Sequence, residues 1–245
     1  MIQVPTAPVE AVVRNPKNLI IYSKPKVGKT SALIGLEHSC LIDTEDGSDF
    51  VTGFKVKVHS VNDIREFGEA VLAAGKPYKY LIIDSITKLE EMCIPYAEQL
   101  YSLSPGGSNW FTEGKKKYGN ILYLPNGSGY MWLRIAYENT IRYISTLAPH
   151  IIQSGHVKDI ILDKAGTEVS SIELDLSGKL KRIAASESDA IGYMYRKDNK
   201  NFISFKTSDS IACGARPVHL RNKDICISEL TADGTVITHW DEIYK

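Results

Sequence analysis

The sequence lacks the features that mark membrane, secreted and zinc-finger proteins. Its four cysteines, Cys40, Cys93, Cys213 and Cys226, form no Cys-x-x-Cys pair, which argues against a zinc site or a redox motif and favours reduced thiols in a cytoplasmic protein. No apolar run approaches the roughly 20 residues of a membrane-spanning helix. The first 18 residues show no basic start followed by an apolar stretch, so neither a signal peptide nor a membrane partner is expected.

An excess of charge of one sign is also absent. The chain has 29 Lys and Arg residues and 29 Asp and Glu residues. This balance argues against a dedicated high-affinity binder of duplex DNA, which is usually basic, although a local basic patch would be enough to contact nucleic acid. With 245 residues, 43% of them apolar, the chain can bury a substantial core, as one large α/β domain or as two small ones.

Short apolar runs alternate with helical segments through the first 156 residues. Strands are predicted at 19–22, 40–42, 55–59, 80–83 and 150–154, and helices at 29–38, 62–74, 86–101 and 131–147. Asn62 is the predicted N-cap of the second helix, and Gly75 its end. This alternation predicts a mostly parallel central sheet flanked by helices. Beyond residue 157, segments such as SSIELDL and NFISFKT alternate between polar and apolar residues, which predicts β-hairpins.

The segment SKPKVGKT, residues 23–30, lies between a predicted strand and a predicted helix. This is the setting of a P-loop, whose backbone N–H groups bind phosphate oxygens. Lys29 would reach the β- and γ-phosphates of ATP, and the Thr30 hydroxyl would ligate Mg²⁺. Ser23 replaces the first glycine of the pattern, which a serine can do if the backbone there needs no positive φ. The alternative to a P-loop is a chance occurrence of Gly-Lys-Thr. The predicted ATP-binding residues are Ser23, Lys24, Pro25, Lys26, Val27, Gly28, Lys29, Thr30 and Ser31.

Asp84 ends the apolar strand YLII and is the second candidate for the metal. A carboxylate at the carboxyl edge of a parallel sheet, beside a P-loop, can hold Mg²⁺. The alternative is that Asp84 or Ser85 caps the helix that follows.

Four acidic residues follow the second predicted strand in the segment LIDTEDGSD, residues 41–49. Glu45 is a candidate general base for the water that attacks the γ-phosphate, and Asp43 and Asp46 compete with it. A turn with solvated charges is the alternative. Later, in PHIIQSGH, Gln153 and His156 are both candidates to sense the γ-phosphate at the tip of a core strand, although a lone His is more often structural.

The segment 102–129 interleaves aromatic and basic residues within a loop rich in glycine, proline and serine. Trp110 and the run Lys115, Lys116 and Lys117 predict a surface for single-stranded DNA, because bases stack on aromatic rings and phosphates pair with lysines. The alternative is a solvated loop with its aromatic residues in the core. Farther along, Lys206, Arg216 and Arg221 are candidates to act on a neighbouring subunit's ATP, with surface charge as the alternative.

Four segments, in this order and spacing, resemble the RecA-like core ATPases, and more closely the compact phage-encoded RecA-like proteins associated with single-strand annealing and recombination. They are SKPKVGKT at 23–30, LIDTEDGS at 41–48, YLIIDSITKLEE at 80–91 and HIIQSGH at 150–156. The resemblance implies that Glu45 is the catalytic base and that His156 is the phosphate sensor. It also implies a homo-oligomeric ring or filament with ATP at the subunit interface, single-stranded DNA as a partner, and room for a single-strand-binding protein.

We therefore predict an Mg²⁺-dependent ATPase that acts on single-stranded DNA in recombination, annealing or replication, in the host cytoplasm if it is phage-encoded. Its expected parts are an extended arm at 1–17, a RecA-like core at 18–210 and a β-rich tail at 211–245 packed on the core. One alternative is an ATP-binding scaffold with little turnover. Another is a small-metabolite kinase, but no arginine-rich lid lies between 100 and 160. A GTP switch is disfavoured because Asn222-Lys223-Asp224 lacks the guanine-binding spacing.

Overall fold

The computed structural model describes residues 4, 6–8, 10, 14–112, 115–116, 118–164, 167–208 and 211–245. Within these residues, an eleven-stranded sheet runs through the centre, in the order β13-β12-β10-β9-β1-β7-β4-β2-β3, with β11 paired to β9 and β8 paired to β7. Its strands are β1 Asn18–Ser23, β2 Ser39–Asp43, β3 Lys55–Lys57, β4 Tyr80–Asp84, β7 His150–Lys164, β8 Thr167–Leu174, β9 Ala190–Lys197, β10 Lys200–Ser204, β11 Gly214–Ala215, β12 Asp224–Leu230 and β13 Val236–Thr238.

The strands from β9 to β3 are parallel to their neighbours, whereas β8 and β10 to β13 pair antiparallel. The predicted fold class, a mostly parallel α/β sheet with a β-rich C-terminal extension, is confirmed. The parallel centre explains the apolar runs of β1 and β4, because a strand covered on both faces has no solvent side.

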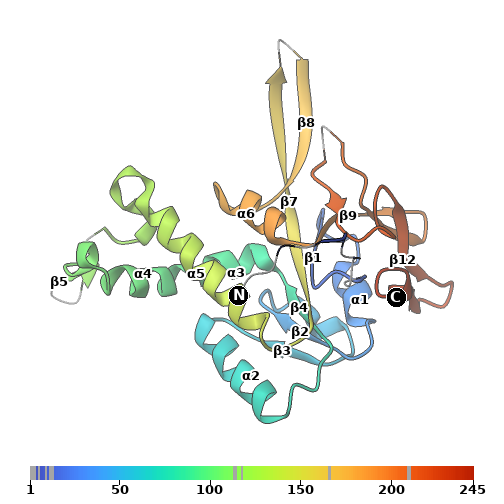
Figure 1. The fold of residues 1–245 in the computed structure, drawn as a ribbon, viewed down its shortest axis with the longest axis horizontal. Coiled ribbons are helices and arrows are strands. Elements are labelled where there is room, and N and C mark those ends of the chain that lie inside the picture. Colours follow the sequence, from blue (N-terminus) through green and yellow to red (C-terminus); the bar gives the residue numbers. More distant parts are fainter. Residues whose placement is uncertain are drawn as a thin grey trace.

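Helices lie on both faces of this sheet (Figure 1). They are α1 Lys29–Ile34, α2 Val61–Ala73, α3 Ile86–Met92, α4 Ile94–Ser102, α5 Ser128–Ile144 and α6 Leu180–Glu187, with 3₁₀ turns at Gly47–Phe50, Pro105–Gly107, Ile121–Tyr123, Pro125–Gly127 and Trp240–Glu242. Ile20 and Tyr22 of β1 join the core that packs under α2 to α6, whereas Leu19 and Ile21 join the core under α1. This alternation is the two-residue period of a strand.

Several helix boundaries differ from the sequence prediction, among them the helix predicted at 131–147, which is α5 Ser128–Ile144. The first helix ends at Ile34, with Gly35 as its C-cap, instead of continuing to residue 38. The cap of α2 is Ser60, not Asn62: the Ser60 side chain accepts from the Asp63 N–H and the Asp63 side chain accepts from the Ser60 N–H, which is a capping box. The helix predicted at 86–101 is broken at Cys93 into α3 and α4, because Pro95 lies in the first turn of α4, a position where its missing N–H costs little.

The strand predicted at 150–154 extends to Lys164 and leaves the body of the sheet. Beyond His156, β7 pairs antiparallel with β8, from Val157 opposite Leu174 to Lys164 opposite Thr167. This hairpin projects from the molecule (Figure 1). The same strand therefore carries the sensor candidates and continues directly into a projecting arm.

The C-terminal tail is tied to the P-loop helix. The Trp240 Nε1 donates to the Ala32 carbonyl oxygen at 2.9 Å, and the Thr238 hydroxyl donates to the Gly35 carbonyl oxygen at 3.1 Å. β12 also forms the next strand of the central sheet beside β10. In the described part of the chain, none of the helices combines the length and the apolar character needed to cross a membrane.

Candidate active site

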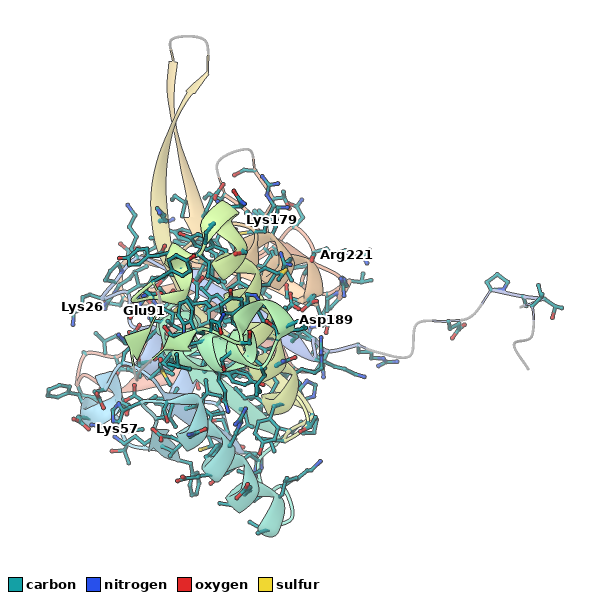
Figure 2. All side chains as sticks on the ribbon, turned by 90° about the vertical axis from the view of Figure 1, so that its left-hand side faces the viewer. Lys26, Lys57, Glu91, Lys179, Asp189 and Arg221 are labelled. Carbon is teal, nitrogen blue, oxygen red and sulfur yellow. The ribbon has the colours of Figure 1, made fainter. Side chains whose placement is uncertain are left out.

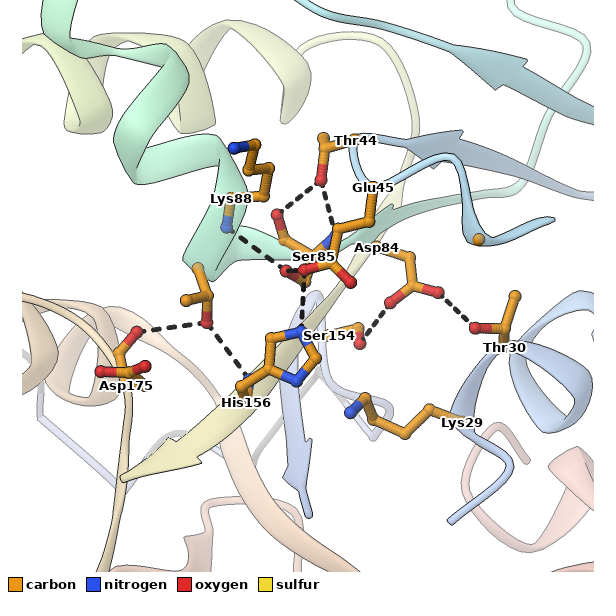
Figure 3. A network of polar contacts seen from close by, with 12 residues as sticks. Lys29, Thr30, Thr44, Glu45, Asp84, Ser85, Lys88, Ser154, His156 and Asp175 are labelled. Atoms are coloured by element: carbon orange, nitrogen blue, oxygen red, sulfur yellow. Dashed lines mark hydrogen bonds and ion pairs between the residues drawn. The ribbon is translucent and has the colours of Figure 1, made fainter. Parts of the chain in front are cut away.

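The carboxyl ends of β1, β2 and β4 meet residues 154–156 of β7 at one edge of the sheet, and the candidate residues gather there (Figure 3). Strand register explains why. Asp84 lies opposite both Asp43 and Ser154, and Ser23 lies opposite His156. Ligands of open α/β sheets bind at this edge.

The P-loop conformation depends on glycine at one position. Gly28 has φ of 101°, which L side chains rarely adopt. Lys29 follows as the first residue of α1, with its side chain turned back over the loop: Nζ donates to the Ser23 hydroxyl at 3.1 Å. Ser23 is the last residue of β1 and so has extended backbone. The departure from the glycine pattern is therefore compatible with the fold, since this position requires no positive φ.

Lys29 is only 8% exposed. Burial lowers the pKa of its ammonium, and the nearby Asp84 and Glu45 carboxylates oppose that shift. A buried cation is costly unless anionic groups surround it. Two carboxylates are already near this ammonium, and a phosphate would add further negative charge at the same place.

Asp84 is held by two hydroxyl groups. Thr30 Oγ1 donates to Oδ2 and Ser154 Oγ donates to Oδ1, both at 2.7 Å (Figure 3). Asp84 does not cap the helix that follows. Ser85 is the N-cap of α3, and its side chain accepts from the Lys88 N–H. A carboxylate beside a hydroxyl is the hard oxygen donor set that Mg²⁺ prefers. The residues present therefore fit the metal predicted from the sequence.

Glu45 lies between the P-loop and β7. Its Oε1 is 2.8 Å from His156 Nε2 and accepts a short hydrogen bond from the Ser85 hydroxyl. The hydrogen bond from His156 lowers the pKa of the Glu45 carboxyl, burial opposes the shift, and Ser85 and Lys29 lower it further. The side chain is therefore an ionised carboxylate at neutral pH and able to accept a proton.

The two competitors of Glu45 have other roles. Asp43 accepts from the N–H groups of Glu45, Gly47 and Ser48 and so holds the loop in place. Burial raises its pKa, but these hydrogen bonds outweigh burial and leave the pKa below its usual value. Asp46 points to the surface, where it forms ion pairs with Lys57 and His59. Asp43 and Asp46 therefore behave as the alternative interpretation expected, because Asp43 shapes the turn and Asp46 is a charge at the surface. Glu45 is the carboxylate of this loop that reaches the site.

The two sensor candidates, Gln153 and His156, lie on opposite faces of β7. Gln153 is buried away from the site, where its Nε2 donates to Asn18 Oδ1 and its Oε1 accepts from the Tyr137 hydroxyl. His156 reaches Glu45, and its backbone N–H donates to Thr87 Oγ1 at 3.2 Å. Its Nδ1 is buried and has no hydrogen-bond partner within the described residues. A polar atom of this kind is typically satisfied by water or a ligand.

The prediction that Trp110 stacks on DNA bases is contradicted by its burial. The side chain is 1% exposed and packs edge-on against the Tyr101 ring, with centroids 5.4 Å apart. Trp110 therefore serves the core, as in the alternative interpretation, whereas Phe111 and Tyr123 of the same loop are exposed. Lys115 and Lys116 form the short strand β6, which pairs with β5 Phe111–Thr112. Lys117 and the lysine side chains of β6 lie outside the described residues, so their DNA-binding role stays a prediction.

The distal basic residues lie apart from this edge. Lys206 forms an ion pair with Asp224. Arg216 donates to Asp189 Oδ1 at 3.2 Å and to the Ser186 carbonyl oxygen at 2.7 Å. The proposed action of Lys206 or Arg216 on a neighbouring subunit stays a prediction.

Sequence reasoning missed three hydroxyl residues of the site. Ser154 holds Asp84, Ser85 holds Glu45, and Thr44 Oγ1 both donates to the Ser85 carbonyl oxygen and accepts from its N–H. The available signal was a Ser or Thr next to a candidate residue in LIDTE, LIIDS and IIQSGH. That signal is weak, because only the strand register shows which hydroxyl faces which carboxylate.

Comparisons with known proteins identify the family to which the chain belongs. A solved structure of a KaiC-like protein from the hyperthermophilic archaeon Pyrococcus horikoshii OT3 is 12% identical, with 91% of this chain and 89% of that chain covered and a TM-score of 0.46. A comparison with curated proteins finds no match. A family model described as an AAA domain matches residues 15–216, a segment that contains the P-loop, Glu45, Asp84 and His156. The chain belongs to this AAA-domain family.

Proposed function

We propose that the protein binds ATP with Mg²⁺ at the carboxyl edge of the sheet and hydrolyses it. One observation carries this proposal: three groups converge beside the P-loop. They are the buried Lys29, the Thr30 hydroxyl bonded to the Asp84 carboxylate, and the ionised Glu45 carboxylate. Family membership supports the same conclusion, because the AAA domain suggests an ATPase. Thr30 and Asp84 are the residues that would hold the metal.

In the proposed reaction, Lys29 and the P-loop N–H groups bind the β- and γ-phosphate oxygens. Glu45 accepts a proton from a water molecule, the water oxygen attacks the γ-phosphorus, and the bond to the bridging β–γ oxygen breaks to release ADP. Bound Mg²⁺ would neutralise charge on the phosphate oxygens. His156 donates from Nε2 to Glu45. Its Nδ1 can accept from the attacking water or, when the ring carries a second proton, donate to the γ-phosphate.

We further propose that this ATPase acts on single-stranded DNA as a homo-oligomer, as the resemblance to RecA-like proteins implies. In the described part of the chain, a basic cavity of about 700 Å³ supports this proposal. It is lined by Arg14, Asn15, Asp189, Arg216, Pro217, Val218, His219, Arg221, Lys223 and Lys245. Asp189 is the one acidic lining residue, in a chain whose charges balance overall. An anionic strand fits this excess of positive charge.

Backbone carbonyl oxygens hold two arginines of the basic cavity in place. Arg216 donates to the Ser186 carbonyl oxygen. Arg221 donates from Nε and Nη2 to the Arg216 carbonyl oxygen, at 3.0 and 2.6 Å. Asp189 and Asn15 precede β9 and β1, so the cavity lies at the amino end of the parallel strands. Figure 2 shows Arg221 and Asp189 on the side of the molecule opposite Lys26 of the P-loop. The cavity can therefore be altered without touching the ATP site.

Charge reversal in the basic cavity tests the DNA part of the proposal. We expect the double variant Arg221→Glu with Lys223→Glu to weaken binding of a fluorescent single-stranded oligonucleotide, measured by anisotropy. The slope of log affinity against log salt should fall by about 1 for each lost phosphate contact. Basal ATP hydrolysis, measured without DNA, should be unchanged if Arg221 serves DNA and not a neighbouring subunit's ATP.

The matched control is Lys197→Glu, which reverses an exposed charge at the end of β9. Equal DNA binding by the double variant and this control would reject the basic cavity as the DNA surface. Absence of DNA binding in the unmodified protein, with ATP hydrolysis intact and sensitive to EDTA, would reject the DNA part of the proposal and leave the ATPase part standing.

A further inference from the structure

A second group of potential metal ligands lies far from the P-loop in the sequence, on the C-terminal strands. Cys226 and Glu229 of β12 and His239, just after β13, bring one ligand atom each to within 4.8 Å of one another. Cys226 Sγ is 3.8 Å and His239 Nε2 is 3.5 Å from Glu229 Oε1. All three residues are partly buried.

A β-bulge produces this juxtaposition. Phe202 of β10 pairs with Cys226, whereas the preceding Asn201 pairs with Ser228, so Ile227 is an extra residue in β12. The extra residue places Cys226 and Glu229 on the same face of the strand, although they are three positions apart. Bulges that redirect side chains in this way are common near functional sites.

The neighbouring strand supplies the third ligand. Ile237 of β13 pairs with Glu229, and His239 follows two residues later, on the same face. The His239 backbone N–H donates to the carbonyl oxygen of the bulged Ile227 at 2.9 Å, which fixes its position beside Cys226. Its Nε2 is buried and forms no hydrogen bond within the described residues.

We propose that Cys226, Glu229 and His239 form a site for a zinc-type divalent cation, with a fourth position left to water. Thiolate, imidazole and carboxylate together suit Zn²⁺ more than Mg²⁺ or Ca²⁺. Tetrahedral coordination with bonds of about 2.0–2.3 Å separates neighbouring ligand atoms by about 3.3–3.8 Å. The two separations around Glu229 Oε1, 3.5 and 3.8 Å, need little adjustment to fit it.

Lys200 competes for this site. Its Nζ lies 2.8 Å from Glu229 Oε1, as a cross-strand ion pair between β10 and β12. This ion pair would explain why Glu229 is acidic. It does not explain why Cys226 and His239 also lie beside Glu229. The ammonium repels a metal cation, so its removal should strengthen metal binding.

The metal site would brace the P-loop helix. The two neighbours of His239, Thr238 and Trp240, donate to the carbonyl oxygens of Gly35 and Ala32. A cation that ties His239 to β12 therefore holds β13 and the following turn against α1. We expect a higher Tm when Zn²⁺ is present, whether or not the protein hydrolyses ATP.

Cobalt substitution tests the proposal directly. Metal-free protein, prepared with EDTA and freed of it, is titrated with Co²⁺. We expect one equivalent to produce a near-ultraviolet thiolate-to-Co²⁺ charge-transfer band, which excess Zn²⁺ removes. The P-loop offers only oxygen ligands, so Co²⁺ bound there gives no such band. Cys226→Ser and His239→Ala should each weaken binding at least about 10-fold, whereas Cys213→Ser is the matched control and should bind like the unmodified protein.

Weaker Co²⁺ binding in a ligand variant could also result from misfolding. The Lys200→Met variant removes no ligand and should bind Co²⁺ more tightly than the unmodified protein, a result that misfolding cannot produce. A missing band in both the unmodified protein and Lys200→Met overturns the proposal. Persistence of the band in Cys226→Ser also overturns it, since another thiol would then be the ligand.

Discussion

Replacing Glu45 by glutamine is expected to lower kcat for ATP hydrolysis by about 10²- to 10⁴-fold, the usual contribution of a general base. The glutamine side chain keeps an oxygen that can accept from Ser85 and His156, so the loop and the affinity for ATP should change little. The measurement is steady-state hydrolysis at saturating ATP, alongside the equilibrium binding of ATP.

Asp46→Asn is the matched control, because Asp46 belongs to the same acidic loop but pairs with Lys57 and His59 at the surface. Its kcat should equal that of the unmodified protein. If Glu45→Gln also leaves the hydrolysis rate unchanged, the catalytic assignment is wrong and the scaffold with little turnover becomes the better interpretation.

The pH dependence of the rate has a defined sign at Glu45. Its folded pKa lies below the ordinary value of 4.5, chiefly because His156 donates to it. The carboxylate is therefore already ionised above pH 4.5 and its protonation reduces the rate only as the pH falls below that value. A loss of activity between about pH 7 and pH 5 would consequently not come from Glu45 and should persist in Glu45→Gln, relative to its own lower maximum.

Truncation of Trp110 to alanine is expected to lower the free energy of unfolding by about 3–5 kcal/mol, as for other large buried aromatic residues. Trp110 is 1% exposed and lies within the core beside Tyr101 and Tyr118. Phe111 is the matched control: it is the next residue, also aromatic, but 52% exposed. Phe111→Ala should cost much less in urea unfolding.

The same pair of variants decides between the two interpretations of this loop. A structural Trp110 predicts a lower urea midpoint for Trp110→Ala and unchanged DNA affinity below that midpoint. Unfolding equal to that of Phe111→Ala, together with weaker binding of single-stranded DNA, would restore the stacking role predicted from the sequence.

Local sequence was sufficient for the parts of the site that lie next to one another along the chain. Gly28, Lys29 and Thr30 follow a strand and open a helix, and Asp84 ends an apolar run. The order of strands and helices also predicted the parallel sheet. These features depend on residue spacing and on the apolar period, both of which are visible without tertiary contacts.

The choice among neighbouring candidates required the fold. Glu45 was one of three acidic candidates in its loop, and only the structure shows that Asp43 holds the turn while Asp46 faces solvent. Gln153 and His156 are three residues apart on one strand, and the core partners of Gln153 separate them. Such distinctions depend on contacts between residues distant in the sequence.

The proposed metal ligands show the same limit more strongly. Cys226 has no cysteine partner at metal-binding spacing, so the sequence argued against a zinc site. The bulge at Ile227 and the pairing of β12 with β13 bring Glu229 and His239 to it. The bulge adds one residue to β12 and so breaks the two-residue alternation from which the faces of a strand are predicted.

The most direct test of the central claim is steady-state ATP hydrolysis by the unmodified protein and by Lys29→Ala, each with Mg²⁺ and with or without single-stranded DNA. Lys29 is the buried lysine at the head of α1, and the substitution removes the ammonium that we propose binds the phosphates. We predict hydrolysis by the unmodified protein, stimulation by DNA, and loss of both in Lys29→Ala. Equal rates in the two proteins would contradict the assignment of ATP hydrolysis to this P-loop.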